Sequence, residues 1–179
     1  MEFIVKNNNK VNFSKLKPIQ FDNLFTYLEK LSPESKKKFG PHSFDIQSIV
    51  EFYKKPENTG IIGVDVETNQ IISYAIIKKG FVFVDSIRYE SYGLPLNSMT
   101  DCTYAPSVAD EWQSLGVGNA MFKFILAQIQ NSNYKRIILW GGVQMTNKKA
   151  INYYQQNGFI IHGQFNNSIE NLDMLLHLN

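Results

Sequence analysis

Residues 113–121, QSLGVGNAM, place two glycines directly before an apolar run that extends to Ile129. A turn at the start of a buried helix presents backbone N–H groups at the positive end of the helix dipole. Glycine also tolerates positive φ and lacks the Cβ atom that would keep a phosphate away from the backbone. The stretch therefore predicts either an anion-binding turn or a tight turn packed against a sheet, and two glycines alone fit both equally.

Two familiar phosphate-binding loops do not fit these letters. A dinucleotide fingerprint needs Gly or Ala three positions after the second glycine, where this chain has Met121. It also belongs to a repeated strand-helix-strand unit, whereas the preceding region has an antiparallel pattern. A P-loop needs Gly-Lys-Ser/Thr, and Asn119 occupies the position of the lysine.

The chain before the glycines has the pattern of β-structure. Short apolar runs are separated by polar turns at Glu67–Gln70 and at residues 78–80. Such runs joined by short turns are typical of an antiparallel meander. We therefore expect strands at GIIGVDV (60–66), IISYAII (71–77) and FVFVDSI (81–87), and a further extended stretch over residues 101–108.

The chain after the glycines alternates between helix and strand. The short, continuously apolar run at 137–140 is typical of a strand covered on both faces. A second helix is expected from near Asn147 to Gly158, because glycine commonly follows the last helical residue. Alternating apolar residues between 172 and 178 predict a terminal strand.

The first sixty residues carry helical periodicity. Apolar residues at i, i+3, i+4, i+7 and i+10 predict a helix over 21–31, and a similar spacing predicts another over 46–53 with Ser43 as its N-cap. We also expect a short strand or a hairpin around the Asn-rich turn 7–9 and an exposed connection over residues 31–42.

Composition narrows the class of protein. A chain of 179 residues with 44% hydrophobic residues can bury one substantial core, so we expect a single domain. A net charge of +2 does not favour nucleic-acid binding. The single cysteine, Cys102, cannot form an intramolecular disulfide, and neither a signal peptide nor an eighteen-residue apolar run is present. We therefore expect a cytoplasmic protein that does not enter a membrane.

Two patterns in the chain resemble the signatures of the GNAT superfamily of acyl-CoA N-acyltransferases. Residues 108–121, VADEWQSLGVGNAM, contain the core Gln/Arg-x-x-Gly-x-Gly/Ala of the first signature, at Gln113, Gly116 and Gly118. The second signature, Asn-x-x-Ala-x-x-x-Tyr-x-x-x-Gly-Phe, is matched by NKKAINYYQQNGF at Asn147, Ala150, Tyr154, Gly158 and Phe159.

The resemblance covers residues 60–178 well and implies a fold. It implies a single GNAT-like domain over residues 1–179 with an α+β fold. Its central sheet is expected to be mixed and mostly antiparallel, with a splayed parallel strand pair and helices on both faces. The expected parallel strands are 102–108 and 136–140.

The resemblance also implies acetyl-CoA as co-substrate. In the family the diphosphate of coenzyme A lies on the backbone N–H groups of the glycine turn, and the pantetheine arm runs between the two parallel strands. Carried onto this chain, the residues implied to bind the cofactor are Ser107, Val108, Gln113, Ser114, Leu115, Gly116, Val117, Gly118, Asn119, Asn147, Ala150 and Tyr154. For Asn147, a plain helix N-cap is the other interpretation.

Tyr154 matches the family position that supplies a proton to the departing thiolate. A phenol of pKa ~10 and a thiol of pKa ~8.5 differ by about 1.5 units, so complete proton transfer is uphill by roughly 2 kcal/mol. That is small beside a catalysed barrier, and tyrosine is a credible acid. The neighbouring Tyr153 would point elsewhere on the helix and is interpreted as a packing residue.

The general base has three candidates, namely Asp101, Glu90 and His42. Asp101 begins the strand that leads to the acyl carbon, Glu90 follows the third strand of the expected meander, and His42 lies between the first two helices. An unperturbed aspartate taking a proton from an amine faces roughly 9 kcal/mol, so a shifted pKa or a relay is required. Each candidate also fits a solvated or capping role.

Two other chemistries are considered. An acyl-cysteine route through Cys102 needs an adjacent base, and the sequence places neither His162 nor His177 beside it. The histidines lack the paired spacing of metal ligands, so no metal is expected.

We therefore expect an acetyl-CoA-dependent N-acetyltransferase in which a primary amine attacks directly in a ternary complex. The alternative is a catalytically silent acyl-CoA-binding sensor or scaffold. Segments 31–43 and 85–98 are expected to border the acceptor pocket. LSPESKKKFGPH (31–42) is similar to family members proposed to act on amino sugars, while polyamines, amino acids and protein amines stay open as acceptors. The oligomeric state does not follow from the sequence.

Overall fold

The computed structural model describes residues 1–178, and Asn179 lies outside the described residues. The chain forms two compact units. The first unit consists of Met1–Ile77 and Ala105–Asn131, and the second consists of Lys78–Tyr104 and the chain from Ser132 onward. Strands β4 (Ile71–Lys79) and β5 (Asp101–Val108) each continue from one unit into the other.

The first unit is built on neighbouring strands that follow the chain. β1 (Glu2–Ile4), β2 (Lys10–Lys15), β3 (Asn58–Asp65) and β4 lie side by side in this order. β2 is antiparallel to both of its neighbours. A 3₁₀ turn, η1 (Lys6–Asn8), joins β1 to β2, which confirms the expected hairpin.

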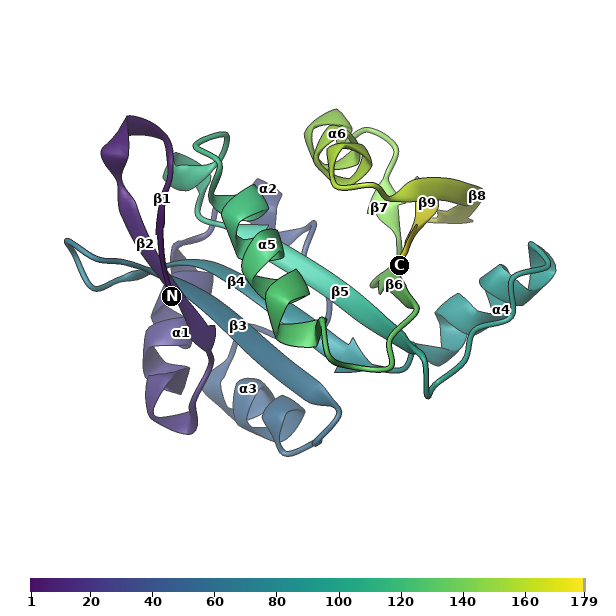
Figure 1. Ribbon diagram of the computed structural model, residues 1–179, viewed down its shortest axis with the longest axis horizontal. Helices are drawn as coiled ribbons and strands as arrows, with labels where there is room; N and C mark the ends of the chain where they lie inside the picture. Colours follow the sequence, from purple (N-terminus) through teal and green to yellow (C-terminus); the bar gives the residue numbers. More distant parts are fainter. Residues whose placement is uncertain (179) are drawn as a thin grey trace. The chain divides into compact units, whose positions relative to one another are not determined.

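Helices cover both faces of these strands. α1 (Phe21–Lys30) and α3 (Ile46–Tyr53) lie on one face and α5 (Val117–Ile129) on the other (Figure 1). The pleat explains this arrangement, because successive side chains of a strand point to opposite faces. Thus Tyr74 of β4 reaches Tyr53 of α3, whereas Phe13 of β2 stacks on Phe124 of α5. Shorter helical segments are η2 (Pro18–Gln20), α2 (Pro33–Lys36) and η3 (Asp110–Trp112).

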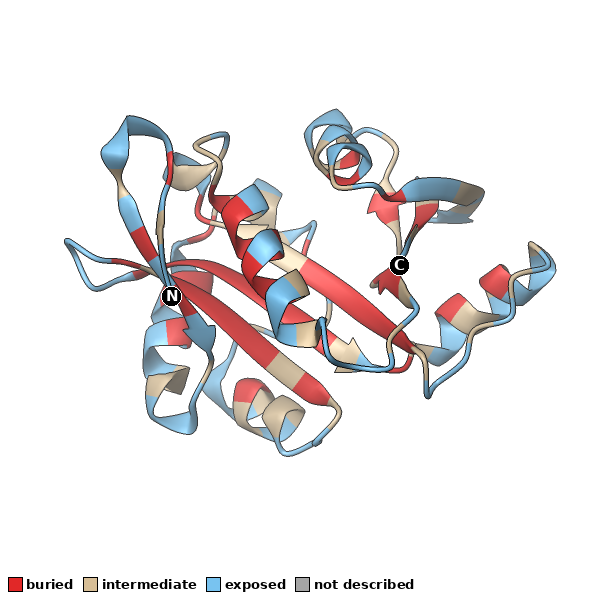
Figure 2. Cartoon of the chain, in the orientation of Figure 1, coloured by how far each residue is buried: buried red, intermediate tan, exposed pale blue. Residues whose placement is uncertain are grey.

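The expected N-cap of α3 is wrong by two residues. Asp45, not Ser43, caps the helix, because its carboxylate accepts a hydrogen bond from Ser48 N at 2.8 Å. The apolar runs that the sequence predicts as strands nevertheless form the core of the first unit. β3 and β4 are buried along most of their length, while the outer sides of α1 and α3 are exposed (Figure 2).

The second unit contains the parallel strand pair. β5 runs parallel to β6 (Arg136–Leu139), with Cys102 opposite Ile137. β9 (Ile169–His177) is antiparallel to β6 and also pairs with β7 (Val143–Gln144) and with β8 (Ile160–Asn167). Helix α6 (Lys148–Gln156) precedes Gly158, whose φ of 86° suits the end of a helix. The sequence reading anticipated β6, α6 and β9 but not β7 or β8.

The expected third strand of the meander, residues 81–87, is wrong, because this segment forms helix α4 (Phe83–Ser91). Phe83, Val84 and Ile87 belong to a largely apolar run in the sequence but are exposed in the structure. Asp85 and Tyr89 face inward instead. The inward face of α4 is thus polar, and it is held by partners from distant parts of the chain that local periodicity cannot reveal.

None of the helices in residues 1–178 combines the length and the apolar character needed to span a membrane.

Candidate active site

The glycine turn has the backbone geometry of a helix start. Gly116 is the N-cap of α5 with φ 91°, and Ala120 N donates the first helical hydrogen bond to Gly116 O at 3.0 Å. Val117, Gly118 and Asn119 form the first turn of α5, at the N-terminal end of the helix. No atom lies within 4 Å of the position that a Cβ at Gly116 would take. Glycine is therefore required at residue 116 by conformation rather than by crowding.

The two glycines differ in conformation. Of the two glycines only Gly116 uses the tolerance for positive φ, because Gly118 lies in the first turn of α5. The second positive φ of the turn belongs to Ser114, at 65°. The turn is braced on its sides, because Leu115 O accepts a hydrogen bond from Lys6 N and Gln113 Nε2 donates one to Val108 O.

The parallel pairing ends inside β5. The register runs from Asp101 opposite Arg136 to Tyr104 opposite Leu139, and Trp140 N donates to Tyr104 O at 3.0 Å. β5 itself continues to Val108. In this last part of β5, the Ser107 hydroxyl is 2.9 Å from the Tyr27 hydroxyl and donates to Tyr74 O at 3.4 Å.

Asn147 and Ala150 form the first turn of α6. The Asn147 side-chain oxygen accepts a hydrogen bond from Ala150 N at 3.2 Å, so this residue is the helix N-cap. Its side-chain amide nitrogen is not used by this bond, and the two interpretations of Asn147 are compatible.

Tyr154 is buried on the inner side of α6. Its ring packs against Phe159, with ring centroids 5.5 Å apart, and burial raises the pKa of its phenol, with a further increase from Tyr153. Among the described residues, no group hydrogen-bonds the Tyr154 hydroxyl. The neighbouring Tyr153 differs, because its hydroxyl is 2.9 Å from that of Tyr104. This bond supports the interpretation of Tyr153 as a packing residue.

His42 lies at one end of a chain of hydrogen bonds in the first unit. Its Nδ1 is 2.8 Å from the Ser43 carbonyl, so Nδ1 carries the proton and Nε2 accepts from the Tyr74 hydroxyl at 2.9 Å. The Tyr74 hydroxyl in turn accepts from Tyr53 at 2.5 Å. Burial lowers the pKa of His42, which keeps the imidazole neutral at pH 7.

The other two base candidates have different surroundings. Asp101 is fully buried, and its carboxylate accepts from Arg136 Nε at 2.8 Å, Arg136 Nη2 at 2.5 Å and Asn97 N at 2.6 Å. Those bonds tie β5 to β6 and to the preceding loop. Glu90 lies in α4, rather than after a strand as expected, and is exposed.

Cys102 has the environment of a core thiol. It is fully buried, and burial, with a smaller contribution from Asp101, raises its pKa to about 12. A thiol with this pKa is protonated at neutral pH and is a poor nucleophile, which disfavours the acyl-cysteine route. The rings of His162 and His177 meet edge to face, with centroids 6.3 Å apart.

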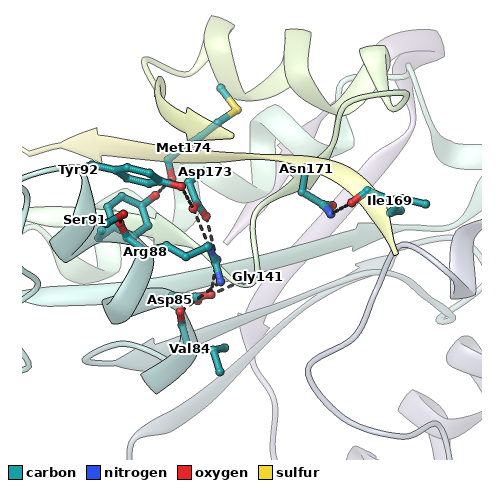
Figure 3. Close-up of polar contacts among 11 residues, drawn as sticks. Val84, Asp85, Arg88, Ser91, Tyr92, Gly141, Ile169, Asn171, Asp173 and Met174 are labelled. Atoms are coloured by element: carbon teal, nitrogen blue, oxygen red, sulfur yellow. Dashed lines mark hydrogen bonds and ion pairs between the residues drawn. The ribbon is translucent and has the colours of Figure 1, made fainter. Parts of the chain in front are cut away.

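The sequence reading missed a buried charge cluster in the second unit. Arg88 donates from Nε and Nη2 to the two oxygens of Asp173, at 2.7 and 2.9 Å, and from Nη2 to Asp85 at 2.7 Å (Figure 3). Tyr92 adds a hydrogen bond to Asp173, and Asp85 accepts from Gly141 N at 3.2 Å (Figure 3). Both aspartate side chains are 0% exposed. Asp85 and Arg88 are three residues apart, and this spacing brings two side chains together on a helix. The sequence would therefore have indicated this ion pair if residues 83–91 had been predicted as a helix.

Along the chain β5 is followed by the glycine turn, the buried helix α5 and then β6, which is parallel to β5, as the resemblance to the GNAT superfamily had implied. The chain belongs to the acetyltransferase (GNAT) family, whose model matches residues 25–159. The general activity of the family is acyl transfer from acetyl-CoA.

Solved structures show the same fold. The GNAT domain of S. lividans PAT superposes with a TM-score of 0.75 at 15% identity, covering 99% of this chain and 96% of that one. A ribosomal-protein-S5-alanine acetyltransferase from Vibrio fischeri gives 0.71 at 14% identity, covering 99% and 96%. A spermidine N-acetyltransferase SpeG chimera from Vibrio cholerae and hSSAT gives 0.64 at 14% identity, covering 93% and 95%. No curated protein sequence matches the chain.

The charge cluster generates a stability prediction. Arg88→Met removes the cation that neutralises Asp85 and Asp173, and leaving buried carboxylates without a partner is expected to cost on the order of 3–5 kcal/mol of unfolding free energy at pH 7.5. Lys54→Met is the matched control, because Lys54 pairs with Glu51 at an exposed site and should change stability by less than about 1 kcal/mol.

The loss of unfolding free energy caused by Arg88→Met should depend on pH. Burial raises the pKa of Asp85 above its ordinary value, and loss of Arg88 raises it further. A raised folded-state pKa means that stability is present at low pH and lost as pH rises through that pKa. Urea denaturation followed by circular dichroism should therefore show a smaller deficit at pH 5 than at pH 7.5. An equal deficit at both values would contradict this account of the cluster.

Proposed function

We propose that this chain is an N-acetyltransferase that transfers an acetyl group from acetyl-CoA to a primary amine by direct attack in a ternary complex. Family membership supports the class of reaction. The single observation that carries the cofactor assignment is the start of α5, where Gly116 adopts φ 91° and no atom lies within 4 Å of the position that its Cβ would take. Such a helix start is suited to a diphosphate.

The residues proposed to hold the cofactor are those that the family resemblance implies. The backbone of the turn would bind the diphosphate, the end of β5 would pair with the pantetheine arm, and the first turn of α6 would hold the arm through side chains. When bound, acetyl-CoA supplies an activated acyl group as a thioester. The proposed set is Ser107, Val108, Gln113, Ser114, Leu115, Gly116, Val117, Gly118, Asn119, Asn147, Ala150 and Tyr154.

Tyr154 is proposed as the general acid. Its raised pKa keeps the phenol protonated throughout the neutral range, and its hydroxyl has a proton to donate that no other described group engages. A raised pKa also makes complete transfer to a thiolate less favourable. A proton that moves only as the thiolate develops avoids the full cost.

His42 is proposed as the general base, acting through Tyr74 and Tyr53. Because Nε2 accepts from Tyr74 and Tyr74 accepts from Tyr53, a proton received at the Tyr53 oxygen can pass along the chain to Nε2 without reorientation of any donor. The lowered pKa of His42 keeps Nε2 unprotonated at pH 7. Asp101 is less suited, because both of its oxygens already hold Arg136, and Glu90 is exposed on α4.

The acceptor is proposed to be a primary amine, either of a small molecule or of a protein. Structures with this fold include enzymes described as acting on spermidine and on an alanine of ribosomal protein S5. The fold therefore accommodates both kinds of acceptor, and an amino sugar remains within the proposed range.

The cofactor assignment is tested with Gly118→Val. The added branched side chain in the first turn of α5 should obstruct the approach of a diphosphate while a helix still forms. Acetyl-CoA affinity measured by calorimetry should fall at least tenfold, which corresponds to ~1.4 kcal/mol. Gly40→Val is the control, because no atom lies within 4 Å of its added Cβ and it is outside the turn. Equal affinity in a folded Gly118 variant would remove the turn from the site.

The acid assignment is tested with Tyr154→Phe. This variant keeps the ring packing against Phe159, and turnover should fall by about 10–10³-fold with acetyl-CoA affinity unchanged. Turnover is measured as free thiol released from acetyl-CoA over a broad amine panel. Tyr153→Phe is the matched control and should lose about 1 kcal/mol of stability but little turnover, because its hydroxyl serves Tyr104.

Two outcomes of this experiment would change the proposal. A Tyr154 variant as fast as its parent would exclude this residue as the acid. Wild-type protein that binds acetyl-CoA but acetylates no amine would favour the silent binding module instead.

The base assignment is tested by pH. Because neutral His42 is the proposed active form, kcat/KM of the wild type should fall as pH drops through the His42 pKa, which lies below the ordinary value of 6.5. His42→Gln should lower kcat/KM by roughly 10–10³-fold and abolish this acid limb. A limb that persists in the variant at the same pH would assign it to another group.

A further inference from the structure

Asp110 connects two segments of the first unit that are far apart in the sequence. It lies in η3, between β5 and the glycine turn. Its Oδ2 accepts from Ser32 N at 2.9 Å, and its Oδ1 accepts from the Ser32 hydroxyl at 3.0 Å and the Ser35 hydroxyl at 2.6 Å. On the other side, Gln113 Nε2 donates to the same Oδ1 at 3.4 Å.

The partners of Asp110 organise both segments. Ser32 is the N-cap of α2, and its hydroxyl also accepts from Ser35 N at 3.2 Å. The carboxylate thus lies at the N-terminal end of the single helical turn within the exposed connection 31–42, where a negative charge is favourable. Gln113 belongs to the glycine turn and is bonded to Val108 O as well. One carboxylate therefore contributes to the order of both the connection and the turn.

Asp110 carries a negative charge close to the glycine turn. Burial alone would raise its pKa, but hydrogen bonds from Ser32 and Ser35 outweigh that effect and the pKa lies below its ordinary value, so Asp110 is ionised at neutral pH. A negative charge close to a site for a diphosphate disfavours binding by simple electrostatics. Asp110 therefore does not favour diphosphate binding through its charge. Its hydrogen bonds to α2 and to Gln113 indicate a structural role instead.

We propose that Asp110 is a positioning residue that couples the glycine turn to the α2 segment, an inference that rests on the proposed binding of acetyl-CoA at this turn. The carboxylate holds the turn in its binding conformation by anchoring it to Ser32 and Ser35. Because coupling is reciprocal, cofactor binding at the turn also stabilises α2, within the segment that we expect to border the acceptor.

Asp110→Asn separates this role from electrostatics by the sign of its effect. The variant removes a negative charge, so electrostatics alone predicts tighter binding of acetyl-CoA. Coupling predicts weaker binding, by about 3–10-fold, because an amide cannot accept all the hydrogen bonds of a carboxylate. Glu111→Gln is the matched control, since it removes a neighbouring exposed charge and should leave affinity unchanged or slightly higher. Calorimetry measures the affinities, and circular dichroism verifies folding.

A double-mutant cycle with Ser35→Ala tests the path of the coupling. Ser35 donates to Asp110 from α2, so its loss should weaken acetyl-CoA binding about 2–5-fold in the wild-type background. In the Asp110→Asn background the same change should have little further effect, because the bridge is already broken. At saturating acetyl-CoA, kcat should stay within about twofold of the wild type in every variant, since the proposed acid and base are intact.

The experiments distinguish a failure of the proposed function from a failure of the coupling. Wild-type protein that does not bind acetyl-CoA would overturn the proposed function, and the coupling with it. Wild-type binding together with equal or tighter binding by Asp110→Asn would overturn the coupling alone. An effect of Ser35→Ala that is the same in both backgrounds would also overturn it.

Discussion

The parallel pairing of β5 with β6 is the constraint on which the rest of the structure depends. Four residues of β5 are paired with β6, from Asp101 to Tyr104, and β5 then continues to Val108 without further partners in that register. A parallel strand cannot follow its neighbour through a short hairpin, so the chain must cross over between them. That crossover contains η3, the glycine turn and α5, which is why a helix N-terminus lies between the two parallel strands in the sequence.

Buried charges fix the second unit around this pair. Arg136 of β6 holds Asp101 at the start of β5, and Arg88 of α4 holds Asp173 of β9. Each arginine makes a bidentate contact, a geometry that restrains orientation as well as distance. Such pairs add little net stability compared with apolar packing, and their bidentate geometry restrains the relative orientation of the elements they join. The ion pairs of Arg88 therefore hold the polar side of helix α4 against β9.

The proposed acid and base illustrate how burial separates two roles. Burial raises the pKa of Tyr154 and lowers that of His42, so both are neutral at pH 7. A neutral phenol has a proton to give, and a neutral imidazole can take one. Both shifts arise mainly from the cost of placing a charge in a low-dielectric interior. No charged partner is needed to set either protonation state.

The sequence by itself indicated the family and, through that resemblance, the parallel strand pair, and it also indicated the start of α5 near Gly116, because these depend on short motifs. The roles of Tyr154 and Asn147 are proposals from the same motifs. The sequence pattern misassigned residues 81–87 as a strand, since the apolar run there is a local signal, whereas the contacts of Asp85 and Arg88 are with Gly141 and Asp173. It also missed Asp110, whose partners Ser32 and Ser35 lie more than seventy residues away. Only the tertiary structure decided these features, because a buried or bridging charge is stabilised by groups that the fold brings close to it. These groups are far apart along the chain, so no local sequence pattern indicates that they meet.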